Sequence, residues 1–219
     1  MLQFSNSRKI GLLLSVIFTL SNCANSSKDV SNCSDSTTIS LGKILNNWVY
    51  ENKDLNFLFK FPLDWNYLDD RNNMQHSVST NDIIPYSETL SITLKDLKNA
   101  ENNKYVLFSL FENSFGKETP KRIVFIVELS KNKNAEKDKQ EWITVFEKQT
   151  KDVPKELKQK YPLKETTLPF GKNEKLPALE AMGRITGFKN YGCYNLVISV
   201  DCFSETDKLE IFKILETIE

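Results

Sequence analysis

The stretch of sequence that decides the fold is Tyr50–Trp65, which reads YENKDLNFLFKFPLDW. Phe57, Phe59 and Phe61 stand at every second position, and this period of two is typical of a strand with one apolar face. Pro62 ends the strand, because proline has no N–H to donate to a neighbouring strand. The stretch therefore predicts a β-strand that carries a row of aromatic side chains.

Trp65 follows this strand closely and is placed to fold back onto its aromatic face. The predicted aromatic corner consists of Phe57, Phe59, Phe61 and Trp65. Packing in a core is the more common role of large aromatic side chains, and an aromatic binding groove is the functional alternative.

The rest of the chain is also rich in predicted strands. They are expected at Trp48–Tyr50, Leu90–Leu94, Tyr105–Phe111, Arg122–Leu129, Leu179–Phe188 and Tyr191–Phe203, the last two as a hairpin around Lys189-Asn190. Helices are expected at Lys137–Lys151, at Lys155–Lys160 and after an N-cap at Ser204. This mixture predicts the α+β class, with an antiparallel β-sheet covered by helices in an α/β/α sandwich.

The N-terminal segment has the layout of an export signal. Arg8 and Lys9 precede an apolar run of about 11 residues from Ile10 to Leu20, whereas a membrane-spanning helix needs about 20. Leu20-Ser21-Asn22-Cys23 resembles a lipobox, so we expect residues 1–22 to be a signal peptide and Cys23 to carry a lipid. Secretion with cleavage nearby, for example after Ala24-Asn25-Ser26, is the alternative, since Asn22 departs from the usual Gly, Ala or Ser.

The predicted organisation is an anchor, a tether and one domain. Residues 23–44 comprise the lipidated Cys23 and a segment rich in Ser, Asn, Thr and Asp, which predicts a flexible tether. Residues 45–219 fit a single domain. The expected location is the bacterial cell envelope, where Ala24 favours the outer membrane over the inner membrane.

The charge of the chain disfavours nucleic acid as a partner. The full chain has 29 basic and 29 acidic side chains, and removal of residues 1–22 takes away two basic ones, so 27 minus 29 leaves −2. A nearly neutral protein offers no field that would attract a phosphate backbone.

Three cysteines remain after Cys23 is set aside, and an odd number cannot form a complete set of disulfides. A bridge from Cys33 to Cys193 or to Cys202 is one interpretation. Buried free thiols, which behave as small apolar side chains, are the favoured one.

The motifs of common catalytic and metal sites are missing from the sequence. His76 is the single histidine and lies in a polar stretch, Asp69–Thr80, that predicts a loop or an edge strand. A solvated surface side chain is its favoured role. No metal-ligand spacing and no glycine-rich phosphate loop is present. We therefore predict no catalytic residue, no metal site and no cofactor, and do not expect an enzyme.

The stretch Tyr50–Trp65 resembles the opening of PsbP-like domains, in which an aromatic strand closes on a Tyr-Pro-x-x-Trp motif. Phe61 stands at the tyrosine position of that motif, and Ile214-Leu215-Glu216-Thr217-Ile218 is similar to the closing helix of the family. This superfamily includes DcrB-like bacterial envelope lipoproteins. The resemblance implies the PsbP-like fold and a protein that acts by binding a partner.

Three functions follow as hypotheses. The first is a lipid-anchored envelope protein that serves as a protein-binding or assembly module for an unknown envelope protein, attached to the membrane through Cys23. The alternative is a small-molecule or lipid-binding envelope protein with a pocket between the sheet and the Lys137–Lys151 helix. A hydrolase that uses two of the many carboxylates is a third and weaker alternative.

Overall fold

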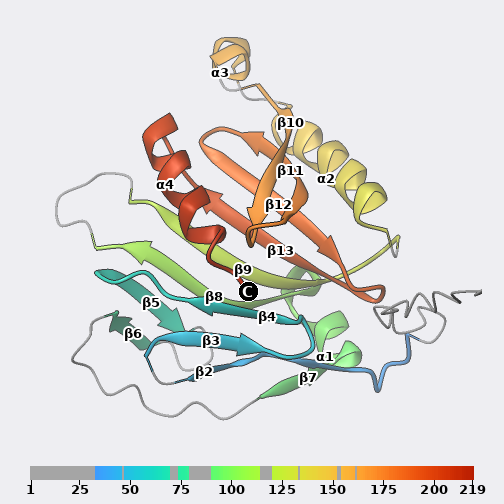
Figure 1. Ribbon diagram of the computed structural model, residues 1–219. Helices are drawn as coiled ribbons and strands as arrows, with labels where there is room; N and C mark the ends of the chain where they lie inside the picture. The colour runs from blue at the N-terminus through green and yellow to red at the C-terminus, as the bar shows by residue number, and fades with distance from the viewer. Residues whose placement is uncertain are drawn as a thin grey trace, which may run out of the picture.

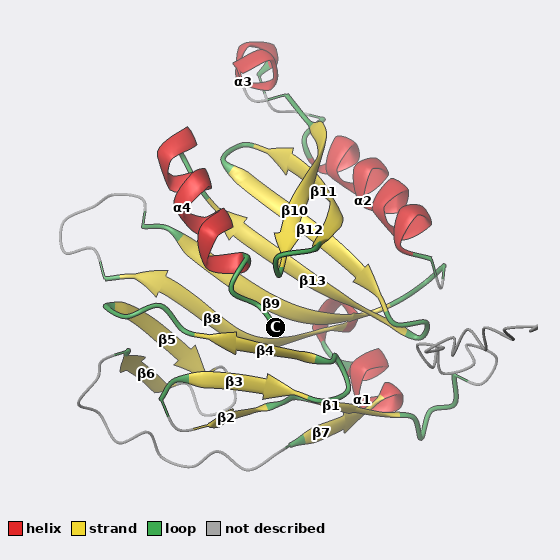
Figure 2. Cartoon of the chain, in the orientation of Figure 1, coloured by secondary structure: helices red, strands yellow, loops and turns green. Residues whose placement is uncertain are grey.

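The computed structural model describes residues 33–45, 47–69, 74–78, 90–113, 120–132, 134–151, 154–160 and 162–219. Figures 1 and 2 show the arrangement of these segments. The predicted signal peptide and Cys23 lie outside the described residues. No helix in the described segments has the length and apolar character needed to cross a membrane.

A large antiparallel sheet dominates the fold. Among the described residues it contains eight strands in the order β10-β11-β12-β13-β9-β8-β5-β6. Their bounds are β5 Trp65–Asp69, β6 Met74–Ser77, β8 Lys104–Glu112, β9 Arg122–Leu129, β10 Lys164–Phe170, β11 Glu174–Ala181, β12 Arg184–Asn190 and β13 Tyr194–Asp201. The central strand β9 has the bounds that its β-branched and aromatic residues predict.

Two smaller sheets accompany the large one in the described part of the chain. The first has the order β2-β3-β4, formed by Lys43–Leu45, Val49–Asn52 and Phe57–Lys60. The second pairs β1, Thr38–Ser40, with β7, Ser91–Thr93. The chain end returns to β4 (Figure 1). There the amide of Glu219 donates to the carbonyl of Leu58 at 3.0 Å, and the carbonyl of Glu219 accepts from the amide of Leu58 at 2.7 Å.

The helices are short, and side chains cap the N-termini of α1, α2 and α4. Their bounds are α1 Leu94–Asn99, α2 Ala135–Gln149, α3 Lys155–Lys160 and α4 Glu205–Leu215, with a 3₁₀ turn η1 at Glu101–Asn103. Ser204 caps α4 as predicted, because its side chain accepts a hydrogen bond from the amide of Asp207. Asn134 caps α2 in the same manner, through the amides of Glu136 and Lys137.

The aromatic residues of β4 pack against the large sheet. The ring centroid of Phe59 lies 5.3 Å from that of Phe125, and Phe57 stacks on Phe125 at 5.8 Å. Phe61, directly after β4, contacts Phe108 with ring centroids 5.2 Å apart, and all of these rings are buried. The core of the domain is therefore a contact between two sheets, built largely from aromatic side chains.

The predicted α/β/α sandwich is wrong. Of the described residues, 45% lie in strands and 25% in helices. On one face of the large sheet, the three-stranded sheet lies beside α4, whose Ile211 and Leu215 join the same core. On the other face, α2 packs over a smaller cluster around Phe188. The sequence did not show that β4 would turn its aromatic face toward a second sheet, so the prediction gave the covering role to helices.

Residues 33–44, which the sequence predicts to be part of the tether, belong to the folded domain. Ile39 and Ile44 are buried, and β1 pairs with β7. Cys33 forms a disulfide with Cys193, 160 positions along the chain. The free-thiol interpretation is therefore wrong for Cys33 and Cys193, while Cys202 is a buried free thiol.

The predicted strand Leu179–Phe188 is two strands. Met182 and Gly183 form the turn between β11 and β12, where Ala181 pairs with Arg184. Both turn residues have positive φ, 53° for Met182 and 77° for Gly183. Glycine accepts this conformation readily and methionine does not. The turn was missed because methionine is not a residue that such turns favour.

Candidate functional site

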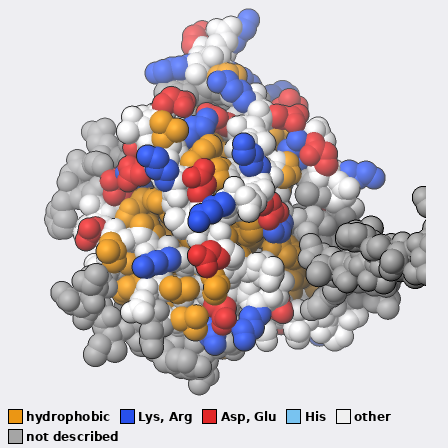
Figure 3. All heavy atoms as spheres, in the orientation of Figure 1, with side chains coloured by type: hydrophobic (Ala, Val, Ile, Leu, Met, Phe, Trp, Pro, Cys, Tyr) orange, Lys and Arg blue, Asp and Glu red, His pale blue; other side chains and the backbone are white. Residues whose placement is uncertain are grey.

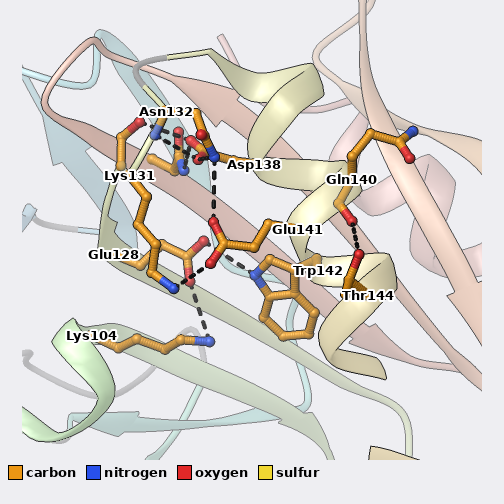
Figure 4. Close-up of polar contacts among 11 residues, drawn as sticks. Lys104, Glu128, Lys131, Asn132, Asp138, Gln140, Glu141, Trp142 and Thr144 are labelled. Carbon is orange, nitrogen blue, oxygen red and sulfur yellow. Dashed lines mark hydrogen bonds and ion pairs between the residues drawn. The ribbon is translucent and has the colours of Figure 1, made fainter. Parts of the chain in front are cut away.

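A cavity lies between α2 and the neighbouring ends of β8 and β9. Its volume is about 440 Å³. It is lined by Asn102, Asn103, Lys104, Glu128, Leu129, Lys131, Asp138, Glu141, Trp142 and Val145. Figure 4 shows that the charged groups come from the two strands, from the segment after β9 and from α2. The cavity occupies the position that the small-molecule hypothesis requires.

Glu128 joins the sheet to the helix across this cavity. It projects from β9 directly opposite Lys104 of β8, and its Oε2 lies 3.2 Å from Lys104 Nζ. Its Oε1 accepts a hydrogen bond from the indole Nε1 of Trp142 at 3.3 Å. Glu128 is only 7% exposed, so its carboxylate is largely removed from water and compensated by these two donors.

Trp142 forms an aromatic wall of the cavity and already contacts a cation. Lys104 Nζ lies 4.3 Å from the centroid of its ring. The ring face of tryptophan attracts ammonium groups through its quadrupole. The Trp142 side chain therefore provides both a donor, at Nε1, and a surface that favours positive charge.

A second ion pair lies at the outer part of the cavity. Lys131 Nζ is 2.6 Å from Glu141 Oε1, and Asn132 Nδ2 donates to Glu141 Oε2 at 3.3 Å. Lys131 and Glu141 are both substantially exposed. Solvent screens this pair, so its groups can change partners at little cost.

Asp138 has a structural role at the start of α2. Its Oδ1 accepts from the amide and the Nδ2 of Asn132 at 3.0 and 2.8 Å. Its Oδ2 accepts from Ser130 Oγ and Asn195 Nδ2, both at 2.8 Å. Burial opposes ionisation, but the hydrogen bonds from Asn195, Ser130 and Asn132 outweigh it, so the pKa of Asp138 lies below its ordinary value.

These hydrogen bonds connect the cavity with the disulfide. Asn190 donates to Ser130 Oγ at 3.0 Å and to Asn195 Oδ1 at 2.8 Å. The amide of Ser130 donates to the carbonyl of Cys193 at 3.1 Å. The cavity and the Cys33–Cys193 bridge therefore lie at the same end of the domain.

The arrangement is suited to binding through charge and aromatic contact. Two lysines, two glutamates and an indole are brought together from elements far apart in the sequence. In the part of the chain that the structure describes, no group of three or more His, Cys, Asp or Glu residues is placed to hold a metal ion. On the face of the molecule in Figure 3, basic and acidic side chains are intermixed.

The structure places the predicted aromatic corner in the core. Phe57, Phe59, Phe61 and Trp65 are all buried and belong to one hydrophobic cluster, so they line no groove. His76 lies in the edge strand β6, and its side chain is outside the described part. Cys23 lies outside the described residues as well.

The charged residues of the cavity were not identified from the sequence. Glu128 carried the clearest signal, because it is the single carboxylate inside the apolar run Arg122–Leu129. A charge in a central strand needs a partner. The partners Lys104 and Trp142 lie 24 and 14 positions away, too far for a local pattern to reveal.

Comparison with known proteins gives no relative to set beside this site. No protein-family model, curated protein or solved structure matches the chain.

Proposed function

We propose that this protein is an exported, lipid-anchored binding protein of the bacterial cell envelope that holds a small polar ligand in the cavity between α2 and strands β8 and β9. The observation that carries the proposal is the cavity itself, of about 440 Å³, with Trp142, Glu128 and Lys104 converging on it. Ligand pockets commonly measure about 300–1,000 Å³ and combine apolar walls with a few well-placed polar groups.

The disulfide supports the exported location. Disulfides persist in oxidising compartments and are rare in the bacterial cytoplasm. The Cys33–Cys193 bridge therefore agrees with the export signal expected from residues 1–22. With the lipid on Cys23, ten positions before Cys33, the domain would stay close to the membrane surface. The PsbP-like resemblance remains a separate prediction, and the binding proposal does not depend on it.

A thermal-shift experiment tests the binding proposal. The full-length protein is mixed with fractions of a small-molecule and lipid extract of the cell envelope, and the fraction that raises the melting temperature is retained. Binding stabilises the folded state, so Trp142→Ala is expected to lose the shift while Thr144→Ala keeps it. Thr144 is the matched control, because it lies on α2 but does not line the cavity. A shift of equal size in both variants would place the ligand elsewhere.

Metabolic labelling with a palmitate analogue tests the anchor. The wild-type protein is expected to take up the label and Cys23→Ala to lose it, whereas Cys33→Ser keeps it. Label that persists in Cys23→Ala would contradict lipidation at this position and favour ordinary secretion.

A protein-binding or assembly module is the second candidate function. The observation that favours it is an exposed apolar tip on the turn between β11 and β12. Met182 and Phe203 are 45% and 55% exposed there, and the Phe203 ring lies over Gly183. A photo-crosslinking residue at position 203 is expected to capture one envelope protein in cells, and the same residue at Lys175, in β11, is the control. Equal capture at the two positions would count against a specific contact.

A further inference from the structure

We infer that the ligand of this cavity is a small zwitterion, with an ammonium group and an oxyanion (a carboxylate or a phosphate) joined by a short chain. This inference rests on the proposed binding function and names the class of ligand. It is carried by the arrangement of the cavity's charges as two separate lysine–glutamate pairs beside a tryptophan ring.

The charges that can reach a ligand sum to zero. Lys104 and Lys131 are balanced by Glu128 and Glu141. Asp138 also lines the cavity, but protein donors occupy both of its oxygens. Its charge lies in the first turn of α2, where the helix dipole offsets negative charge. The cavity is therefore bipolar and has no large excess of either sign.

A ligand with one charge fits this arrangement poorly. An anion on Lys104 would either place a second negative charge beside the nearly buried Glu128, or draw the lysine away and leave Glu128 with only the indole N–H. A cation at Glu128 would displace Lys104 in the same way. Removing one partner from a desolvated pair is costly, because the other charge stays uncompensated. A zwitterion supplies both partners at once and leaves both Lys104 and Glu128 paired.

The present contacts indicate how the zwitterion lies. Lys104 Nζ marks the place where an ammonium is stable, next to Glu128 and over the Trp142 ring. A ligand ammonium would take this position, and Lys104 and Lys131 would turn to its oxyanion. Lys131 and Glu141 are exposed, so their pair opens readily. Figure 4 shows the ammonium of Lys131 and the carboxylates of Glu128 and Glu141 grouped on the same side of the indole.

Two sources supply this chemistry. A free amino acid carries an ammonium and a carboxylate, and an ethanolamine phospholipid carries an ammonium and a phosphate in its headgroup. The cavity lies at the end of the domain that holds Cys33, so a membrane-attached protein would present it within reach of headgroups. The shared feature is the zwitterion, and the experiment separates the two sources.

Isothermal titration calorimetry on the full-length protein tests the inference with two matched series. The first is sn-glycero-3-phosphoethanolamine, ethanolamine and sn-glycero-3-phosphoglycerol, in which the phosphodiester carries one negative charge. The second is L-leucine, L-leucinamide and N-acetyl-L-leucine. In at least one series the zwitterion is expected to bind about tenfold or more tightly than both analogues that carry a single charge. A third arm measures whether phosphatidylglycerol vesicles, with or without phosphatidylethanolamine, compete with sn-glycero-3-phosphoethanolamine for the protein.

Charge variants give a second readout. Lys131→Gln is expected to weaken the zwitterion about tenfold, because it removes one of the two lysines that turn to the oxyanion. Glu141→Gln releases Lys131 from its ion pair and is expected not to weaken the zwitterion. Glu174→Gln is the control, since it removes the partner of Lys189 in an exposed pair on the large sheet that does not line the cavity. Both cavity variants lie at exposed positions, where folding is tolerant of substitution.

Each outcome decides the inference. Tight binding of sn-glycero-3-phosphoethanolamine with competition by phosphatidylethanolamine supports a headgroup, and tight binding of L-leucine alone supports a free amino acid. If a singly charged analogue binds as tightly as its zwitterion or more tightly, the inference fails. The binding function still stands if Trp142→Ala abolishes the heat of binding. If none of the probes binds, the inference fails. The binding function fails with it only if no envelope fraction produces a thermal shift that depends on Trp142.

Discussion

The indole Nε1 of Trp142 donates a hydrogen bond to Glu128 Oε1 at 3.3 Å, and this contact joins α2 to the central strand β9. Glu128 also pairs with Lys104 across the sheet. The three side chains form the inner wall of the cavity between the helix and the sheet. A charged group inside an otherwise apolar strand is thereby given partners from two other elements.

Removal of the Glu128 carboxylate is expected to cost stability. Glu128→Ala leaves the Trp142 N–H and Lys104 without this acceptor, and the free energy of unfolding should fall by about 1–3 kcal/mol. Urea denaturation followed by circular dichroism measures the change. Glu174→Gln breaks the exposed pair with Lys189 and is expected to change stability by about 0.5 kcal/mol or less. Equal effects of the two variants would contradict a special role for Glu128.

Asp138→Ala is expected to destabilise the domain by about 3 kcal/mol at pH 7, because Asn132, Ser130 and Asn195 lose their acceptor. The effect should depend on pH. The pKa of Asp138 is lower in the folded state than its ordinary value, so its contribution is complete above the unfolded pKa of about 4 and is lost as the pH falls through the folded pKa. Urea denaturation of the wild-type protein and of Asp138→Ala, at several pH values from neutral to acidic, measures this contribution. If the difference in stability between the two proteins does not shrink in acid, ionised Asp138 is not its source.

Loss of the disulfide is expected to cost about 2–5 kcal/mol, because the bridge closes a long loop. Cys33→Ser and Cys193→Ser should destabilise the protein equally, and the double variant no further than either. Chemical denaturation without reductant measures the loss of unfolding free energy. Mobility on non-reducing gels shows whether the disulfide is present. A double variant that is clearly less stable than both single variants would show that the two cysteines do not act as one bridge.

Phe59→Ala is expected to lower the free energy of unfolding by about 3–5 kcal/mol, since its ring is fully buried among other aromatic rings. The affinity for a cavity ligand should be unchanged in the folded fraction. Leu63→Ala, at an exposed position nearby, is the control and should change stability by about 0.5 kcal/mol or less. Weakened ligand binding by folded Phe59→Ala would revive the aromatic-groove interpretation.

Cys202 is expected to resist alkylation in the native protein. Burial raises the pKa of its thiol to about 11, so little thiolate forms near pH 8, and thiolate is the reactive form. Peptide mapping after iodoacetamide treatment, with and without urea, compares the rate of Cys202 alkylation in the unfolded and the native protein. Equal rates would mean that the thiol is accessible.

The sequence predicted elements where local signals agree and missed those that depend on distant contacts. β9 and α3 have the predicted bounds, and Ser204 caps α4 as expected. The predicted strand at Leu90–Leu94 changes into α1 at Leu94. The capping box of Thr93 and Asp96 was a readable signal for this change.

Other features had no local signal. The Met182-Gly183 turn places methionine at positive φ, which residue preferences disfavour. The aromatic pattern of Phe57 and Phe59 predicted a buried face, but not that a second sheet would form it. The position of Cys33 in the folded domain depends on Cys193, 160 positions away. The cavity likewise depends on Lys104, Glu128 and Trp142 meeting across three elements.

Native mass spectrometry of the full-length protein, released from cell envelopes without added ligand, shows whether the cavity holds a ligand in the cell. We expect one adduct of small-molecule mass on the wild-type protein and on Thr144→Ala, and no adduct on Trp142→Ala. A wild-type protein without an adduct, or an adduct that Trp142→Ala retains, would contradict a ligand held between α2 and strands β8 and β9.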